Sequence, residues 1–146
     1  MPIEIKDGDG GIGHIIVSRG TVTDQELIDC LKNDLTHDKK KFKKYKYILI
    51  DHTALTKMDI TKETVDLISE LFADISTVNP ESIVAMVAYA TYGANFDLIN
   101  RIARLHELFV YRSHWETLVF KTEMEAVRWI REKVKVKFGI DNLTFN

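Results

Sequence analysis

The chain has 146 residues, of which 45% are hydrophobic and 29% are charged, and its formal net charge is -2. A chain of this length can bury roughly 68–70% of the surface that it exposes when unfolded, so we expect one domain, residues 1–146, that folds without a structural metal. The near balance of 20 basic and 22 acidic residues excludes a global field that would attract nucleic acid. The single cysteine, Cys30, excludes an intrachain disulfide and any site built from several thiolates.

The amino-terminal residues lack the pattern of an export signal. Residues 1–7 contain acids where a signal peptide needs a basic flank followed by an apolar run. The longest strongly apolar stretch, residues 82–90, is far shorter than the ~20 residues that cross a bilayer. We therefore expect a soluble, cytoplasmic protein without a transmembrane segment.

The first third of the chain predicts a hairpin, a helix and a buried strand. Residues 3–5 and 13–19 have strand character and are separated by a glycine-rich turn. A capping box at residues 23–26 and apolar residues at helical spacing predict a helix over residues 24–35. Residues 45–51 then form an apolar, β-rich run that ends in an acid, which is typical of a buried strand.

The remainder of the chain alternates helix and strand. A second helix is predicted between Thr61 and the Asn79-Pro80 stop, a fourth strand over residues 83–89, and a third helix over residues 96–109. A short strand at residues 118–120 precedes a last helix, which Thr122 caps. Its predicted apolar stripe consists of Met124, Val127, Ile130 and Val134. The order ββαβαβαβα predicts an α/β domain with a mainly parallel five-strand sheet and four helices.

The segment from Gly8 to Gly13 matches the letters of the G-x-G-x-x-G dinucleotide motif. That motif requires the third glycine to open a helix that faces the pyrophosphate, whereas a strand follows here. We interpret it as the hairpin turn and predict no cofactor.

The best-placed polar group is Asp51-His52-Thr53, at the predicted carboxyl end of a central strand, with Asp59 before the second helix. Open α/β sheets bind ligands at this edge, so the group is either a ligand site or an ordinary strand-end turn. Neither a serine nucleophile motif nor a metal-binding histidine pair accompanies it. We therefore predict no catalytic or metal-binding residue, and an enzyme that uses Asp51 and His52 is kept only as an alternative.

A lysine-rich segment follows the first helix and is the candidate contact for an anionic partner. It contains two interleaved aromatic residues and the lysines Lys39, Lys40, Lys41, Lys43 and Lys44. Such a composition suits anionic lipid or phosphate, but lysines after a helix end also simply favour its dipole and keep a loop soluble.

Large aromatic residues late in the chain suggest an interface. Phe109, Tyr111 and Trp115 crowd a connecting segment, and Trp129 lies off the apolar stripe of the last helix. Such residues anchor protein interfaces, although they also cover the ends of a protein's own core. His106 falls inside the apolar arc of the third helix, where it is either a satisfied core residue or a group for ligand binding or pH sensing.

The order of the elements, the run Tyr47-Ile48-Leu49-Ile50-Asp51 and the terminal Ala126-x-x-Trp129-Ile130 pattern resemble the SpoIIAA-like family. That family shares the fold of STAS domains and is similar to CRAL-TRIO lipid-transfer domains. In anti-sigma-factor antagonists of the STAS group, a strand ending in an acid leads to an Asp-Ser-Ser-Gly turn whose first serine is phosphorylated. Here Asp59 matches the acid, Ile60 occupies the serine position, and Thr61 lies one residue later.

The resemblance implies a non-enzymatic domain without the usual phosphoserine that binds a protein partner or an apolar ligand. From the late aromatic residues we expect the first of these, protein–protein association, starting from a homodimer, which is the commonest assembly. The alternative that the resemblance implies is a carrier or sensor for a lipid or another apolar small molecule. In either case, Asp51, His52, Thr53, Asp59 and Thr61 form the expected ligand or switch region.

Overall fold

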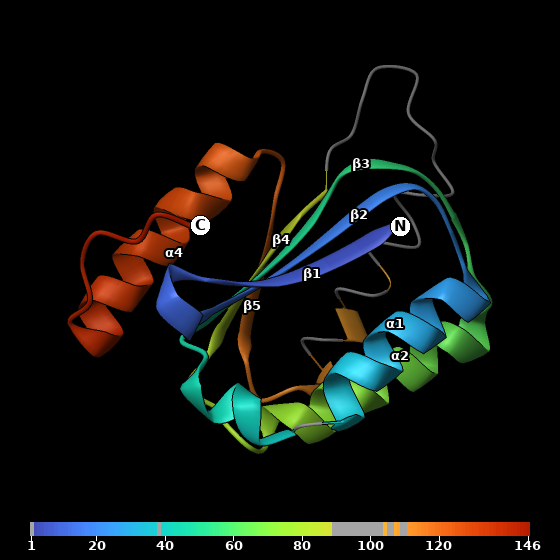
Figure 1. Ribbon diagram of the computed structural model, residues 1–146, viewed down its shortest axis with the longest axis horizontal. Coiled ribbons are helices and arrows are strands. Elements are labelled where there is room, and N and C mark those ends of the chain that lie inside the picture. The colour runs from blue at the N-terminus through green and yellow to red at the C-terminus, as the bar shows by residue number, and fades with distance from the viewer. Residues whose placement is uncertain (1, 38, 89–103, 105–106, 109–110) are drawn as a thin grey trace.

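A computed structural model describes residues 2–37, 39–88, 104, 107–108 and 111–146 of the chain (Figure 1). Its sheet contains β1 (Ile3–Gly8), β2 (Gly13–Thr23), β3 (Tyr47–Asp59), β4 (Ile83–Val87) and β5 (Glu116–Phe120), in that spatial order. β1 is antiparallel to β2, and every other neighbouring pair is parallel. The predicted α/β class and the mainly parallel five-strand sheet are confirmed.

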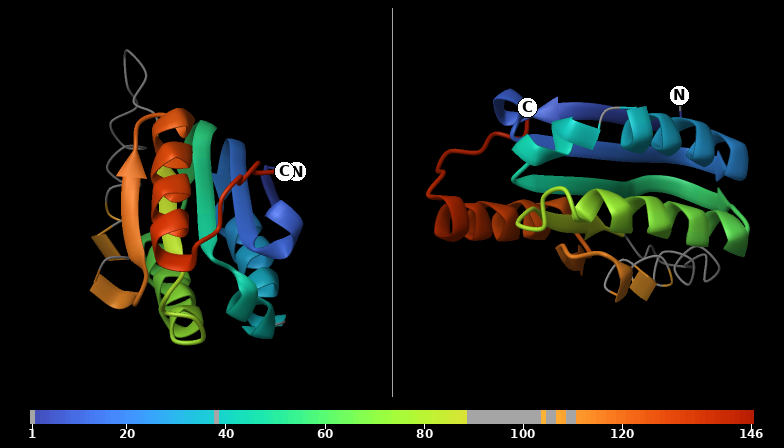
Figure 2. Two further views of the ribbon diagram at one scale, coloured as in Figure 1. Left: turned by 90° about the vertical axis from the view of Figure 1, so that its left-hand side faces the viewer. Right: turned by 90° about the horizontal axis from the view of Figure 1, so that it is seen from below.

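Helices cover both faces of this sheet (Figure 2). α1 (Asp24–His37) and α2 (Lys62–Ser76) lie side by side on one face, and α4 (Glu123–Phe138) lies on the other. Short 3-10 turns, η1 (Asp9–Gly11) and η2 (Lys39–Lys44), follow β1 and α1. Most of the helix expected over residues 96–109 lies outside the described residues.

Side-chain caps explain where the long helices begin. The Thr23 hydroxyl accepts from the Glu26 amide at 3.4 Å while the Glu26 carboxylate accepts from the Thr23 amide at 3.2 Å, which confirms the first capping box. Thr122 caps α4 by accepting from the Glu125 amide at 3.2 Å. These bonds satisfy amides that a helix leaves unpaired at its start.

The prediction that the third strand ends near Asp51 is wrong, because β3 continues to Asp59. β2 and β3 stay paired as far as Thr23 and Asp59, beyond the level at which β4 ends. Their register shifts twice, between Val17 and Arg19 and again between Gly20 and Thr21. Such irregularities break the period-two alternation, so the polar second half of β3 does not look like a strand in the sequence.

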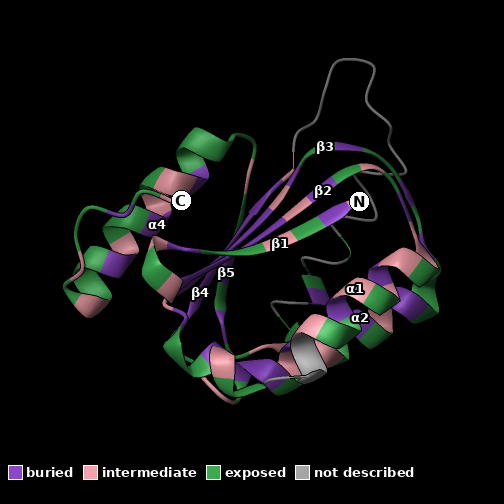
Figure 3. Ribbon diagram, viewed as in Figure 1, coloured by how far each residue is buried: buried purple, intermediate pink, exposed green. Residues whose placement is uncertain are grey.

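The sheet divides the interior into two cores that β3 joins. Ile48 and Ile50 pack toward α1 and α2, whereas Tyr47 and Leu49 pack toward α4, as neighbouring residues of a strand must. Burial is greatest in β4 and in the first half of β3, whereas the edge strands β1 and β5 are partly exposed (Figure 3).

The predicted stripe of the last helix needs one correction. α4 buries Ala126, Ile130 and Val134, whereas Met124 is 71% exposed. Spacing by four residues places the small Ala126 against the sheet and turns Met124 outward.

No helix in the described part of the chain is long and apolar enough to span a bilayer.

Candidate functional site

Asp51, His52 and Thr53 lie within β3 and do not form one site. Asp51 pairs with Val17 on one side and with Val87, the last residue of β4, on the other. Its carboxylate accepts from the amide and the hydroxyl of Thr53, at 2.9 and 2.7 Å. Adjacent strand residues face opposite sides of a sheet, so Asp51 faces the α4 side and His52 the α1/α2 side. The expectation of a joint Asp51/His52 group at a strand end is therefore wrong.

His52 is buried in apolar surroundings, with 7% of its surface exposed. Neither of its ring nitrogens has a hydrogen-bond partner among the described residues. Burial lowers the pKa of His52 to about 4, although the nearby Asp51 carboxylate acts in the opposite direction. The imidazole is therefore neutral at physiological pH.

His52 and Ser18 are the polar residues that line a cavity of about 30 Å³, whose other walls are apolar. A volume of this size holds about one or two water molecules and no lipid tail.

The start of α2 brings together Asp59, Thr61 and Asp24. The Thr61 hydroxyl accepts from the Thr64 amide at 3.3 Å, and the Thr61 amide donates to the Asp24 carboxylate at 2.7 Å. Because Asp24 is the first residue of α1, this bond joins the amino-terminal ends of both helices. Asp59 ends β3 next to them, whereas Ile60, which we expect at the position of the phosphoserine of the STAS antagonists, is only 5% exposed. Asp59 and Thr61 were predicted from the sequence as part of a switch region, whereas Asp24 was not, because its only signal is its place after a capping residue.

The lysine segment is divided between the core and the surface. Phe42 and Tyr45 are each 1% exposed, so these aromatic residues anchor η2 to the core and cannot enter a membrane. Lys41 is paired with Asp34, and Lys44 lies 3.2 Å from Asp7. The other three predicted contact residues, Lys39, Lys40 and Lys43, are exposed, and none of them forms an ion pair within the described part of the chain.

A buried polar cluster that the sequence analysis missed holds this segment in place. His14, 1% exposed, has its Nε2 2.8 Å from Asp34 and its ring stacked on Tyr45, with centroids 4.6 Å apart. Burial would raise the pKa of Asp34, but the hydrogen bond and charge of His14 and the ion pair with Lys41 hold it below its usual value. A signal for Asp34 was available, because it continues the stripe of Leu27 and Leu31 at helical spacing.

The aromatic residues separate into buried and exposed groups. Trp115 is 4% exposed, and its indole nitrogen donates to the Asn79 carbonyl at 2.8 Å. It belongs to this chain's own core, so its expected role as an interface anchor is wrong. Tyr111 is 87% exposed, and Trp129 is half-buried against Phe120, with ring centroids 5.5 Å apart. Phe109 and His106 lie outside the described residues.

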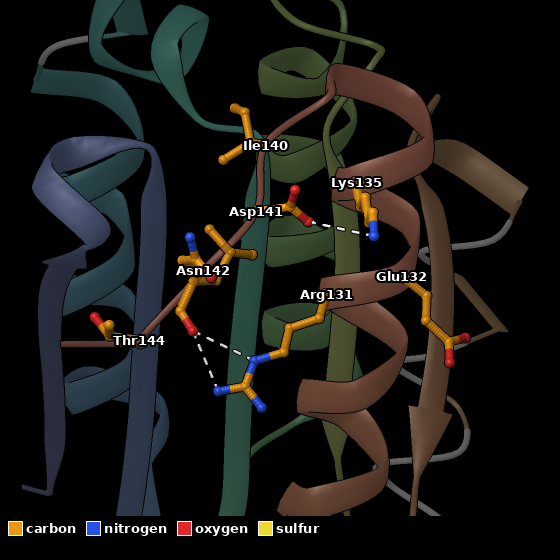
Figure 4. Close-up of a pocket in the computed structure, with 8 residues that line it drawn as sticks. Arg131, Glu132, Lys135, Ile140, Asp141, Asn142 and Thr144 are labelled. Atoms are coloured by element: carbon orange, nitrogen blue, oxygen red, sulfur yellow. Dashed lines mark hydrogen bonds and ion pairs between the residues drawn. The ribbon is translucent and has the colours of Figure 1, made fainter.

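An open groove of about 480 Å³ runs between α4 and the chain that follows it (Figure 4). Arg131 points from α4 toward the segment that follows this helix, and two of its side-chain nitrogens donate to the Leu143 carbonyl, at 3.3 and 3.1 Å. The Lys135 ammonium nitrogen lies 3.6 Å from a carboxylate oxygen of Asp141. Both cations therefore hold the carboxyl-terminal segment, and no sequence pattern indicated this groove.

No family model matches the sequence, and no curated protein resembles it closely enough to be matched. The architecture, however, superposes on the solved structure of the anti-sigma factor antagonist SpoIIAA in its unphosphorylated form, with a TM-score of 0.51 and 13% sequence identity. The match covers 88% of this chain and 97% of SpoIIAA. The chain has the SpoIIAA-like fold.

A second solved structure matches less closely. It is an uncharacterised protein of the DUF3478 family with a SpoIIAA-like fold from Shewanella loihica PV-4, with a TM-score of 0.43 and 17% identity, covering 88% of this chain and 91% of that protein. The structural match to SpoIIAA confirms the fold that the element order and the terminal pattern predicted.

Proposed function

We propose that this SpoIIAA-like domain is a non-enzymatic regulatory module that binds another protein through the end of the molecule where α1 and α2 begin. The observation that carries the proposal is the exposed Thr61, which caps α2 two residues after Asp59, the acid that ends β3. This is the arrangement of strand, turn and helix in which the STAS antagonists place their switch. The solved protein that shares the fold is itself described as an anti-sigma factor antagonist.

Regulation would differ from a phosphoserine switch in one respect. A buried isoleucine, Ile60, replaces the family's serine, so partner binding would depend on the surface formed by Asp24, Asp59 and Thr61. Two helix amino termini and two carboxylates meet there, and these groups offer a partner several hydrogen-bonding and charged contacts.

The two alternatives have less support. A carrier needs room for its ligand, and the cavity beside His52 holds about one or two waters. An enzyme built on Asp51 and His52 would need both side chains at one substrate, but they face opposite sides of the sheet.

The test compares partner capture by the full-length wild type with capture by Thr61→Asp. Aspartate is also a good helix cap, so this variant keeps α2 intact while adding a third carboxylate to the surface. We expect cross-linking and mass spectrometry to identify a host protein whose recovery Thr61→Asp lowers about tenfold, a change of about 1.4 kcal/mol.

The matched control is Thr77→Asp, at the opposite end of α2, where Thr77 is also exposed. It should leave capture unchanged. Equal recovery with both variants, or no specific partner for the wild type, would contradict the proposal.

A further inference from the structure

β5 is an edge of the sheet with unusual surface chemistry for an edge strand. Its side chains Leu118 and Val119, on opposite faces of the sheet, are 42% and 37% exposed. β1, at the other edge, carries Glu4 and Lys6, and Glu4 pairs with Arg19 at 2.8 Å. Proteins usually protect an edge strand from pairing with another chain by placing charged side chains of this kind on it, and the centre of β5 has no charged side chain.

The backbone of β5 is oriented for a further pairing. The Ala88 amide donates to the Phe120 carbonyl at 3.0 Å, so Phe120 directs its backbone groups toward β4. Because backbone groups alternate along a strand, Glu116 and Leu118 do the same, whereas Thr117 and Val119 direct theirs to the open edge. Within the described residues, no further strand pairs with that edge.

We propose that a second copy of this chain pairs with β5 in the antiparallel direction, with the two-fold axis at Leu118. Thr117 of each copy would then exchange backbone hydrogen bonds with Val119 of the other. Leu118 would lie opposite its own counterpart in a non-hydrogen-bonded pair, where side chains approach most closely. Each copy would thereby cover the exposed leucine of the other.

The charges around β5 favour this direction of pairing. The strand begins with Glu116 and is followed by Lys121. Antiparallel pairing brings the acidic end of one copy close to the basic end of the other, whereas parallel pairing would place like charges together.

The neighbouring flank of α4 extends the contact. Trp129 packs on Phe120, and Lys133 lies 3.0 Å from Glu116, so this side of α4 faces β5. Val136 continues the same flank at helical spacing and is 87% exposed. Figure 2 shows α4 standing next to β5 at this side of the sheet. A dimer through β5 would bring the flank formed by Trp129, Lys133 and Val136 close to its equivalent.

The first test uses opposite charges at the two-fold axis. The full-length wild type should form dimers in light scattering at high concentration and dissociate on dilution. Leu118→Lys and Leu118→Glu, each alone, should weaken dimerisation about tenfold or more, because each places like charges face to face. Mixing the two variants should restore a dimer, since only a two-fold contact places residue 118 opposite itself.

Leu67→Lys is the matched control, because Leu67 is 37% exposed on α2, away from β5. It should dimerise as the wild type does. A wild type that is monomeric at every concentration, or a dimer that Leu118→Lys leaves intact, would overturn the proposal without affecting the Thr61 test.

A second measurement tests the proposed pairing even if the charged variants fold poorly. Leu118→Cys should form an intermolecular disulfide under mild oxidation, since opposed Cα atoms about 4.5 Å apart suit such a bond. Leu67→Cys should not. A Leu118→Cys chain that stays monomeric under oxidation would also contradict the proposed pairing.

Discussion

At the scale of single residues, the direction of a side chain decides its chemistry here. Asp51 and His52 are neighbours in sequence, yet one accepts local hydrogen bonds on the α4 side while the other is enclosed by apolar residues. Desolvation penalises the charged imidazole, so His52 is held neutral by its surroundings and not by a partner among the described residues.

This gives a prediction for stability against pH. The unfolded state takes up a proton on His52 near pH 6.5, whereas the native state resists it until about pH 4. The unfolded state therefore binds more protons in this window, and the free energy of unfolding should fall by about 3 kcal/mol as the pH drops through it. Urea unfolding of the wild type and of His52→Leu at several pH values measures this, and His52→Leu should lose much less stability.

The control is Ile50→Leu, which changes the same core without removing a titratable group. It should retain the wild-type dependence on pH. If the wild type and His52→Leu lost stability in parallel between pH 6.5 and pH 4, burial of a neutral His52 would be refuted.

At the scale of elements, the carboxyl-terminal segment is fastened to the β1–β2 turn. The Asp9 carboxylate accepts from the Thr144 amide at 2.6 Å, the Thr144 hydroxyl at 3.0 Å and the Phe145 amide at 3.0 Å. Burial acts to raise the pKa of Asp9, but these bonds and the Tyr47 hydroxyl hold it below its usual value. The carboxylate therefore stays charged and keeps the segment attached at neutral pH.

We predict that Asp9→Gly releases this segment. Asp9 has a φ of 51°, so glycine fits its backbone conformation and the variant removes the carboxylate without straining the turn. Hydrogen exchange at the Thr144 and Phe145 amides should accelerate about tenfold, which corresponds to about 1.4 kcal/mol.

Asp141→Asn serves as the comparison, because it removes the ion pair with Lys135 but none of the bonds to Asp9. Exchange at Thr144 and Phe145 should then change little. Slow exchange in Asp9→Gly would contradict the prediction and would show that the remaining contacts, such as the Arg131 bonds to the Leu143 carbonyl and the packing of Phe145 on Tyr47, are sufficient to hold the segment.

At the scale of the whole molecule, the two cores depend on the same strands. β3 contributes Ile48 and Ile50 to one core and Tyr47 and Leu49 to the other, so the loss of either core would expose apolar residues of a strand on which the other core also depends. A single cooperative unit is therefore expected.

The two tryptophans allow a direct measurement, because Trp115 lies in the α1/α2 core and Trp129 packs against the α4 core. In Trp115→Phe, the fluorescence of the remaining Trp129 reports on the α4 core. In Trp129→Phe, the fluorescence of the remaining Trp115 reports on the α1/α2 core. In each variant, the fluorescence and far-ultraviolet circular dichroism transitions should coincide in urea. Separate midpoints in either variant would mean that the chain unfolds as more than one unit.

The order of the elements could be predicted from the sequence because it depends on local patterns. Capping residues such as Thr23 and Thr122 mark helix starts, and apolar runs such as residues 47–50 mark buried strands, wherever they lie in the fold. The same patterns predicted the α/β class, and their resemblance to the SpoIIAA-like family, with the terminal Ala126-x-x-Trp129-Ile130 motif, predicted the SpoIIAA-like fold that the comparison confirms.

Only the tertiary structure decided which of these residues meet. The length of β3 depends on its pairing with β2, and the burial of Trp115 depends on Phe72, 6.0 Å away between ring centroids and distant in sequence. Asp34 and His14 could not be paired from the sequence, because the charge state and reach of a side chain depend on neighbours brought by other elements. Local periodicity therefore specified the elements, while desolvation and long-range contact decided the candidate site.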